Sequence, residues 1–187
     1  LVLIIATPVA SAQGMKIGII DMNRVFAEYY KTKDAEKDVN DQKALAKKEL
    51  DERNARYREL IDKYQELAKQ IKDPTITEEL RAQKQQQAKE VANEARSLER
   101  ERKEFADRRQ RMLLTEVDRA RKAIIEEIQD LVRDTAKKGN YDLVFDKSGL
   151  GTRGIPFLLH SKDAVDFSET IITQLNQNAP SSAEGEE

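Results

Sequence analysis

The stretch Lys72-Asp73-Pro74-Thr75-Ile76-Thr77-Glu78 decides the fold, because it interrupts a charged segment that otherwise favours helix throughout. Pro74 is the one proline in residues 32–138, and this range contains no glycine. Proline disfavours helix at the residue before it, and the four residues that begin with Thr75 match a capping box. We therefore predict that one helix ends near Lys72 and that a second helix starts near Thr75.

Each of these two predicted helices carries a stripe of mostly apolar residues at the spacing of a coiled coil. In the first helix the stripe consists of Val39, Lys43, Ala46, Leu50, Arg53, Tyr57, Leu60, Tyr64, Leu67 and Ile71. In the second helix it consists of Leu80, Val91, Ala95, Leu98, Phe105, Met112, Val117, Ala120, Ile124, Ile128 and Leu131. Helices joined by so short a turn run antiparallel. Residues 32–138 are therefore predicted to form a coiled-coil hairpin with its turn near 73–75.

The second stripe is less regular toward the predicted turn than toward the base of the hairpin. The polar residues on or near it are Lys84, Gln87, Arg102 and Arg109. Residues 117–131, by contrast, supply a dense series of aliphatic side chains. Because local stability follows the density of apolar contacts, we expect a firm base and a loosely packed tip. We also expect residues 116–132 to pack on the rest of the protein.

The segments on either side of the hairpin are typical of strands and short helices. Residues 16–22, KIGIIDM, predict a strand because they are rich in β-branched side chains, and residues 23–30 predict a short helix. We expect residues 15–31 and 139–177 to form one small body together. The predicted fold class is therefore α+β, mostly α: a long antiparallel hairpin on a small β-containing body.

The part of this body that follows the hairpin begins at Gly139, which we expect to end the second long helix in a left-handed conformation. Residues 141–146 and 155–160 predict two strands joined by a glycine-rich connection. Asp166-Phe167-Ser168-Glu169 then predicts the start of a last helix, whose apolar stripe is Phe167, Ile171 and Leu175.

The two ends of the chain differ from the rest in composition. Leu1 to Val9 is apolar and is followed by Ala10-Ser11-Ala12, which matches the cleavage pattern of a secretory signal peptide. The charged n-region is missing, so we expect residues 1–12 to be a truncated signal peptide, cleaved near Ala12-Gln13. The alternative is that Met15 is the true start. Residues 178–187, NAPSSAEGEE, are polar and acidic and are predicted to be disordered.

The residue types and motifs indicate no catalytic site. The 187 residues include no cysteine and one histidine, His160, which cannot supply the ligand set of a typical zinc site. Residues 149–154, GLGTRG, match G-x-G-x-x-G, but a strand rather than a helix is predicted to follow, so we interpret them as a flexible connection. The sequence also contains no G-x-x-x-x-G-K-[ST] motif. We therefore predict no catalytic residues, no metal, no cofactor and no enzymatic activity.

Charge is high but evenly balanced. Charged residues make up 36% of the chain, yet the formal net charge is only −2. The most basic stretch is Arg100 to Arg111, RERKEFADRRQR, in which carboxylates are interleaved. We interpret it as a solvated helix face, with weak contact with anionic membrane lipids as the functional alternative. The balance of charge argues against nucleic-acid binding.

The order of the segments resembles the OmpH/Skp-like family of periplasmic chaperones. The residues that carry the resemblance are Lys16 to Met22, Asn23 to Tyr30, Tyr141 to Asp146, the predicted strand before Ser161-Lys162-Asp163, and Asp166 to Ile171. The resemblance covers about residues 15–177. It implies a homotrimer in which the strands of three chains build a small barrel and three hairpins enclose a cavity. It also implies that this cavity holds unfolded outer-membrane proteins in the periplasm without ATP.

Two sets of candidate residues follow from this resemblance. The client-contact candidates are Tyr57, Leu60, Tyr64, Leu67, Ile71, Ile76 and Leu80. The oligomerisation-core candidates are Ile17, Ile19, Leu143, Val144, Phe145, Phe157 and Leu159. For the first set the alternative is a purely structural role in the coiled coil. For the whole chain the alternative is a structural coiled-coil protein of the cell envelope, with a nucleic-acid binder as a less favoured third hypothesis.

Overall fold

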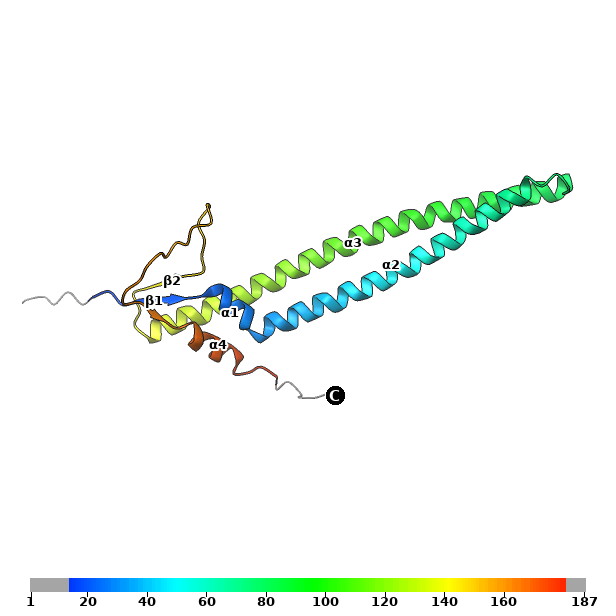
Figure 1. Cartoon of the computed structure of the whole chain (residues 1–187). Coiled ribbons are helices and arrows are strands. Elements are labelled where there is room, and N and C mark those ends of the chain that lie inside the picture. Colours follow the sequence, from blue (N-terminus) through cyan, green and yellow to red (C-terminus); the bar gives the residue numbers. More distant parts are fainter. Residues whose placement is uncertain (1–13, 181–187) are drawn as a thin grey trace, which may run out of the picture. The chain divides into compact units, whose positions relative to one another are not determined.

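The computed structural model describes residues 14–180 (Figure 1). The predicted signal peptide and residues 181–187 of the predicted acidic tail lie outside the described residues. The described chain divides into two compact units: the arm unit, Ala35–Ala120, and the body unit, which contains the described residues before and after it. The predicted fold class, a mostly helical α+β chain with a long antiparallel hairpin, is confirmed.

Three strands and four helices make up residues 14–180. In chain order they are β1 (Ile17–Ile20), α1 (Met22–Glu28), α2 (Tyr30–Ile71), α3 (Glu78–Lys138), β2 (Leu143–Asp146), β3 (Val165–Asp166) and α4 (Ser168–Asn176). The predicted strands at 16–22 and 141–146, the two long helices and the last helix are thus all present.

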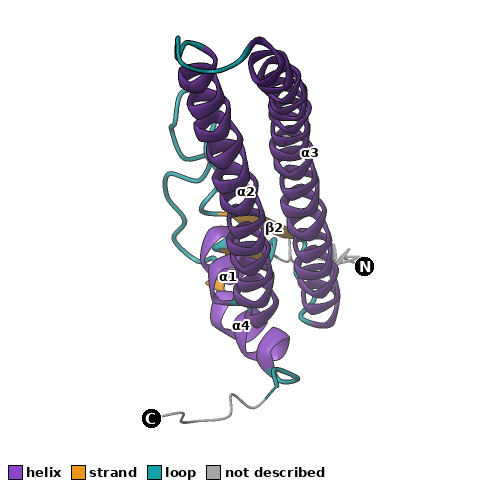
Figure 2. Ribbon diagram, turned by 90° about the vertical axis from the view of Figure 1, so that its right-hand side faces the viewer, coloured by secondary structure: helices purple, strands orange, loops and turns teal. Residues whose placement is uncertain are grey.

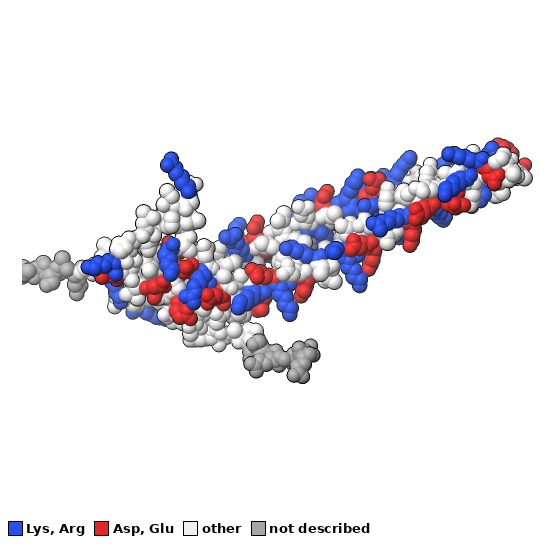
Figure 3. Space-filling model, viewed as in Figure 1, with Lys and Arg blue, Asp and Glu red and all other residues white. Residues whose placement is uncertain are grey.

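Through the arm unit, α2 and α3 run side by side in opposite directions (Figures 1 and 2). Basic and acidic side chains alternate along the visible face of this unit (Figure 3). Some of them pair between the helices, as Arg56 does with Glu94 at 2.8 Å. Because such exposed pairs contribute only about 0–1 kcal/mol each, the pairing of the two helices depends mainly on the contacts described below.

The turn between α2 and α3 differs from its prediction in one respect. The second helix starts at Glu78 and not near Thr75. Thr77 caps it, since its Oγ1 accepts a hydrogen bond from the Leu80 amide at 3.3 Å. Thr75 cannot act as the cap because its amide and its hydroxyl both donate to Asp73 Oδ1, at 2.8 and 2.7 Å. A local turn at Asp73 therefore competes with the predicted capping box and displaces the helix start.

The end of α3 also differs from its prediction, because the left-handed residue is Asn140 (φ 50°) and not Gly139. The Tyr141 amide donates to Ala136 O and the Asn140 amide donates to Lys137 O, which together form a Schellman motif. Gly139 is needed for a different reason. A Cβ at this position would lie 2.5 Å from Cε2 of Tyr141, whose ring covers the end of the helix.

The body unit contains a parallel sheet with the order β2-β1-β3. Along β1, Ile17 to Ile20 pair in register with Leu143 to Asp146 of β2. On the other edge, Gly18 pairs with Val165 of β3. A Cβ on Gly18 would lie 2.5 Å from Cε1 of Phe167, so glycine at this position lets the aromatic ring pack directly on the central strand.

One core holds the body unit together. Its buried apolar residues are Ile20, Val25, Tyr29, Ile124, Ile128, Phe167, Ile171, Ile172 and Leu175. They come from β1, α1, the residue between α1 and α2, α3, the residue before α4, and α4 itself. Ile124 and Ile128 of α3 are buried, while the packing of residues 116–132 on the body stays a prediction.

The predicted strand at 155–160 is wrong. Residues 147–164 form a loop between β2 and β3, and within it the structure has a single antiparallel bridge, Leu150 to Pro156. Two hydrogen bonds flank this bridge, from the Gly151 amide to Ile155 O and from the Phe157 amide to Gly149 O. Pro156 has no amide proton to extend a ladder. The β-branched and aromatic residues of this segment therefore form a loop instead of a strand.

Candidate functional site

A buried apolar core joins the two helices in the half of the arm unit nearest the turn. Its members are Leu60, Leu67, Ala88, Val91, Ala95 and Leu98, with Tyr57, Ile61 and Ile71 packed against them. Each of the six is at most 9% exposed. Removing so many apolar side chains from water stabilises the helix pair over this length. The distal arm therefore has a continuous coiled-coil interface.

This core places the client-contact candidates in two groups. Leu60 and Leu67 are buried inside it. Tyr64 and Leu80 are 42% and 40% exposed, so they offer apolar surface to a partner. The half-buried candidates are Tyr57, Ile71 and Ile76. Client contact by any of them stays a prediction.

The expectation of a loosely packed tip is wrong, because cationic side chains complete the interface. Arg102 lies 4.6 Å above the centroid of the Tyr57 ring. Lys84 donates to Gln70 Oε1 at 2.6 Å across the two helices. Long aliphatic stems pack on apolar neighbours while their cationic ends reach polar groups or aromatic faces. Polar residues in the stripe are therefore compatible with a closed interface.

Toward the base of the arm unit the interface opens into a groove of about 340 Å³ between α2 and α3. We call it the proximal groove. Its lining residues are Lys43, Ala46, Lys47, Leu50, Phe105, Ala106, Arg109, Gln110, Leu113 and Leu114. Leu114 is 59% exposed at its edge. None of the client-contact candidates lines it.

Sequence reasoning missed this groove, although one signal was present. Met112, Leu113 and Leu114 are three consecutive apolar residues on a helix. Consecutive residues point in different directions around a helix, so a single coiled-coil stripe accounts for only one of them. The other two of these side chains must either contact something besides the partner helix or be exposed to solvent.

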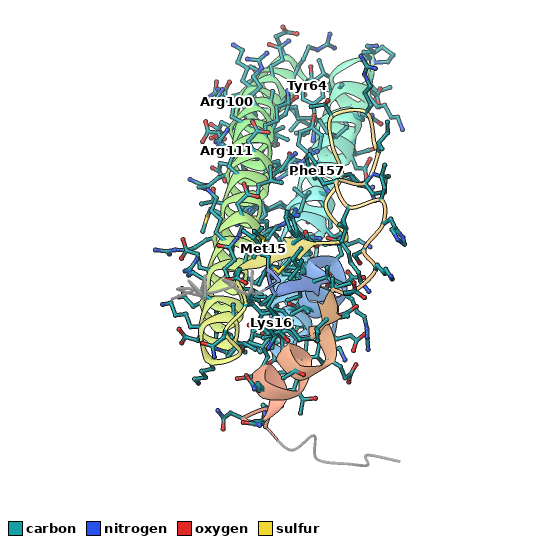
Figure 4. The ribbon with its side chains drawn as sticks, turned by 90° about the vertical axis from the view of Figure 1, so that its left-hand side faces the viewer. Met15, Lys16, Tyr64, Arg100, Arg111 and Phe157 are labelled. Atoms are coloured by element: carbon teal, nitrogen blue, oxygen red, sulfur yellow. The ribbon has the colours of Figure 1, made fainter. Side chains whose placement is uncertain are left out.

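Most oligomerisation-core candidates are accessible in the body unit. Ile17, Ile19 and Val144 are half-buried, and Leu143 and Phe145 are exposed on β2. Phe157 (Figure 4) and Leu159 lie on the loop after β2. They are 76% and 77% exposed. So many large exposed apolar side chains on one small unit are typical of a surface that another chain covers.

The body unit also contains a cavity of about 520 Å³. Its lining residues are Ile20, Met22, Asn23, Phe26, Arg121, Ile125, Gln129, Val132, Arg133, Ala136, Val144 and Asp146. Ile20 and Val144 come from the sheet, while Ile125 and Val132 come from α3. The cavity thus separates part of the sheet from the helix, and the helix does not fully cover the sheet there.

A hydrogen-bonded triad fixes the start of α2 to α3 within the body unit. Tyr29 Oη donates to Glu127 Oε1 at 2.8 Å, and Lys31 Nζ donates to both oxygens of the same carboxylate. Burial, with the hydrogen bond to Glu127 next, raises the pKa of Tyr29 to about 12. The hydrogen bond from Lys31 is the main cause that lowers the pKa of Glu127. All three groups keep one charge state near neutral pH, so the triad has a structural role.

Within residues 14–180, no group of three or more His, Cys, Asp or Glu side chains is arranged to hold a metal ion. His160 is exposed on the loop after β2. The G-x-G-x-x-G match at 149–154 is followed by more of this loop and not by a helix. Over the same described range, no helix has the length and apolarity needed to cross a membrane.

Residues 16–175 match the protein family described as "Outer membrane protein (OmpH-like)". The match begins one residue before β1 and ends within α4, so it includes both units. No curated protein matches the chain.

Proposed function

The chain belongs to the OmpH-like family, and from this premise we propose that it is an ATP-independent holdase that binds unfolded outer-membrane proteins. At the level of the family, membership supports a periplasmic chaperone of outer-membrane proteins rather than an enzyme. The proposal adds the mechanism: the arm unit binds unfolded clients through many weak contacts and keeps them from aggregating.

The observation that carries this proposal is the surface of the arm unit. It combines mixed charges with separate exposed apolar side chains, among them Leu45, Tyr64, Leu80 and Met112. Charges of both signs limit association between arms, while scattered apolar groups provide contacts of low affinity. A holdase needs this combination, because it must bind unfolded chains without aggregating itself.

We further propose that three copies assemble through their body units, with the hairpins enclosing a shared cavity. Both edge strands of the sheet, β2 and β3, have one side without a strand partner in the described chain. Open strand edges favour pairing with another chain. The exposed Phe157 and Leu159, together with the body cavity, provide apolar surface that such partners would cover.

Weak contact with anionic lipids is a second, minor part of the proposal. Arg100 and Arg111 lie on the side of α3 that faces away from α2 (Figure 4). Their surroundings include carboxylates, so we expect binding to anionic vesicles at low salt and its loss at physiological salt. Salt-resistant binding would require a stronger lipid site than this surface provides.

The decisive experiment is an aggregation assay. A urea-unfolded β-barrel membrane protein is diluted into buffer with the full chain, and light scattering is followed. We expect suppression at a stoichiometric ratio of assembled chaperone to client. A variant in which a short glycine-serine linker replaces residues 50–109 should lose suppression and keep its oligomeric state. Full suppression by this variant would place client binding on the body unit, and none by the intact chain would favour a structural role.

A further inference from the structure

We propose that the proximal groove binds an extended client segment in which apolar residues alternate with carboxylates. This inference rests on the proposed function and adds to it the part of the arm that makes the main contact and the chemistry that it recognises. The groove lies entirely within the arm unit, between residues 43–50 of α2 and 105–114 of α3.

Small residues on both helices contribute to the groove. Ala46 and Ala106 both line it, where the distal core has leucines such as Leu60 and Leu98. The short alanine side chains leave part of the space between α2 and α3 unfilled. The floor that remains is formed by aliphatic and aromatic side chains, chiefly Leu50, Phe105 and Leu113. A volume of about 340 Å³ lies at the lower end of the range for ligand sites, roughly 300–1,000 Å³.

The charges around the groove have one sign. Lys43, Lys47 and Arg109 line it, and its lining, as far as the structure describes it, includes no carboxylate. Arg109 is held in place, because it donates to Glu49 at 3.1 Å and lies 5.4 Å from the Phe105 ring centroid. Its charge is partly satisfied by this contact. The two lysines are therefore the cations best suited to meet a partner, and they favour an acidic one.

The spacing of the two lysines favours an extended segment. Lys43 and Lys47 are one turn apart on the same face of α2, about 6 Å along the helix axis at ~1.5 Å per residue. In an extended chain, residues i and i+2 lie on one face and are about 6.6–6.8 Å apart. Two carboxylates on one face of such a segment therefore match the lysines. The residue between them points to the opposite face, where it can enter the apolar groove.

Strands of membrane β-barrels alternate in this way, because one face meets lipid and the other is polar. An unfolded outer-membrane protein therefore contains segments of the required pattern. A phospholipid also combines apolar and anionic groups, but it carries one phosphate, whereas two carboxylates of an extended chain can pair with both lysines at the same time. The lysine spacing thus favours the polypeptide over the lipid.

The test uses two synthetic 12-residue peptides with the same alternating apolar residues and either Asp or Lys at the positions between. Binding to the full chain is measured by fluorescence anisotropy at low and physiological salt. We expect the Asp peptide to bind more tightly. Lys43→Glu/Lys47→Glu should weaken its binding by about tenfold, since two ion pairs are lost and replaced by repulsion. The same variant should bind the Lys peptide better than the unmodified chain does.

Matched controls separate the groove from the rest of the arm. Lys63→Glu/Lys69→Glu makes the same charge change on exposed residues of α2 outside the groove and should leave both affinities nearly unchanged. Leu114→Gln should weaken binding of both peptides. Leu45→Gln should not, although Leu45 is as exposed as Leu114 (61% against 59%), because Leu45 does not line the groove. Circular dichroism checks that each variant keeps its helices.

The outcomes distinguish this inference from the proposed function. If the intact chain suppresses aggregation but Lys43→Glu/Lys47→Glu binds both peptides as the intact chain does, the groove assignment is overturned and the holdase stands. If the intact chain neither binds peptide nor suppresses aggregation, both fail. If Lys43→Glu/Lys47→Glu loses binding only to vesicles of anionic phospholipid, the occupant of the groove is lipid. A changed oligomeric state of Leu114→Gln would mean that a second copy of the chain covers the groove.

Discussion

The guanidinium of Arg53 on α2 lies 4.1 Å above the ring centroid of Phe105 on α3. Arg109 approaches the same ring at 5.4 Å. Phe105 is 7% exposed, so this aromatic ring is almost completely covered by its neighbours. At these positions a cation on an aromatic face takes the place of a leucine pair, which lets a strongly charged hairpin keep a closed interface.

We predict a measurable coupling between Arg53 and Phe105. Arg53→Met keeps the aliphatic stem, and Phe105→Leu keeps an apolar side chain, but each removes the stack. A double-mutant cycle in urea should give a coupling free energy of about 0.5–1 kcal/mol, the usual size of such a contact at a partly exposed site. Arg58→Met, on the exposed side of α2, paired with Phe105→Leu serves as the control. Additive effects for the Arg53 pair would mean that the stack contributes no stability.

Amide exchange in the arm unit should be slower near the turn than toward its base, which is the opposite of what the sequence suggests. From the sequence we expected fast exchange near the turn. The buried core at Leu60, Leu67 and Val91 instead predicts slow exchange there. Faster exchange is expected around Leu45 and around residues 112–117, where the large side chains are exposed. Exchange measured by mass spectrometry on the free protein tests this, and uniform protection along both helices would contradict it.

The error in that expectation has an identifiable cause. Counting polar residues in the stripe treated Arg102 and Arg109 as defects, yet both stack on aromatic rings of the arm. A heptad pattern shows which side chains face the partner helix but not how long cationic side chains fold over their neighbours. It also shows nothing of the groove that Ala46 and Ala106 line, because that requires the register of two helices.

The triad of Tyr29, Lys31 and Glu127 predicts how the stability of the body unit changes with pH. The pKa of Tyr29 is raised from 10 to about 12, so its contribution is complete below pH 10 and is lost as the pH rises toward 12. The pKa of Glu127 is lowered, so its contribution is present above about pH 4.5 and is lost as the pH falls further.

Single substitutions separate these two effects. Tyr29→Phe should cost about 1 kcal/mol at neutral pH, through the lost hydrogen bond, and should reduce the loss of stability above pH 10. Lys31, whose pKa is also raised, contributes the rest of that loss. Glu127→Gln should reduce the loss below pH 4.5. Urea unfolding at a series of pH values measures both, and pH profiles identical to that of the unmodified chain would show that the triad does not stabilise the fold.

The end of α3 gives a prediction about backbone conformation. Asn140 has a positive φ, which costs most residues about 1–2 kcal/mol. Asn140→Ala should therefore destabilise the protein by about 1 kcal/mol, while Asn140→Gly should be neutral or slightly stabilising. Thermal unfolding compares the two variants. Equal effects would indicate that the positive φ is not the source of the cost.

The sequence predicted the long helices and the strands of the body but not how those strands combine. Residues 16–22 and 141–146 carry strong strand patterns, whereas β3 is only two residues long, Val165–Asp166, and has no such pattern. It pairs with β1 because Phe167 packs on Gly18, a contact between distant parts of the chain. Residues 155–160 have a stronger strand pattern than the residues of β3, but Pro156 interrupts that pattern.

The position of β1 between β2 and β3 has a consequence for the order of folding. As the chain is made from its N-terminus, β1 comes first, but both of its neighbours follow the whole arm unit. The hairpin closes around a short turn, and contacts near this turn join residues close in sequence and form fast. β1 instead pairs with strands that are far away in the sequence, and such contacts form slowly. The arm unit can thus fold while the sheet is still incomplete, and the last segment to be made completes the body unit.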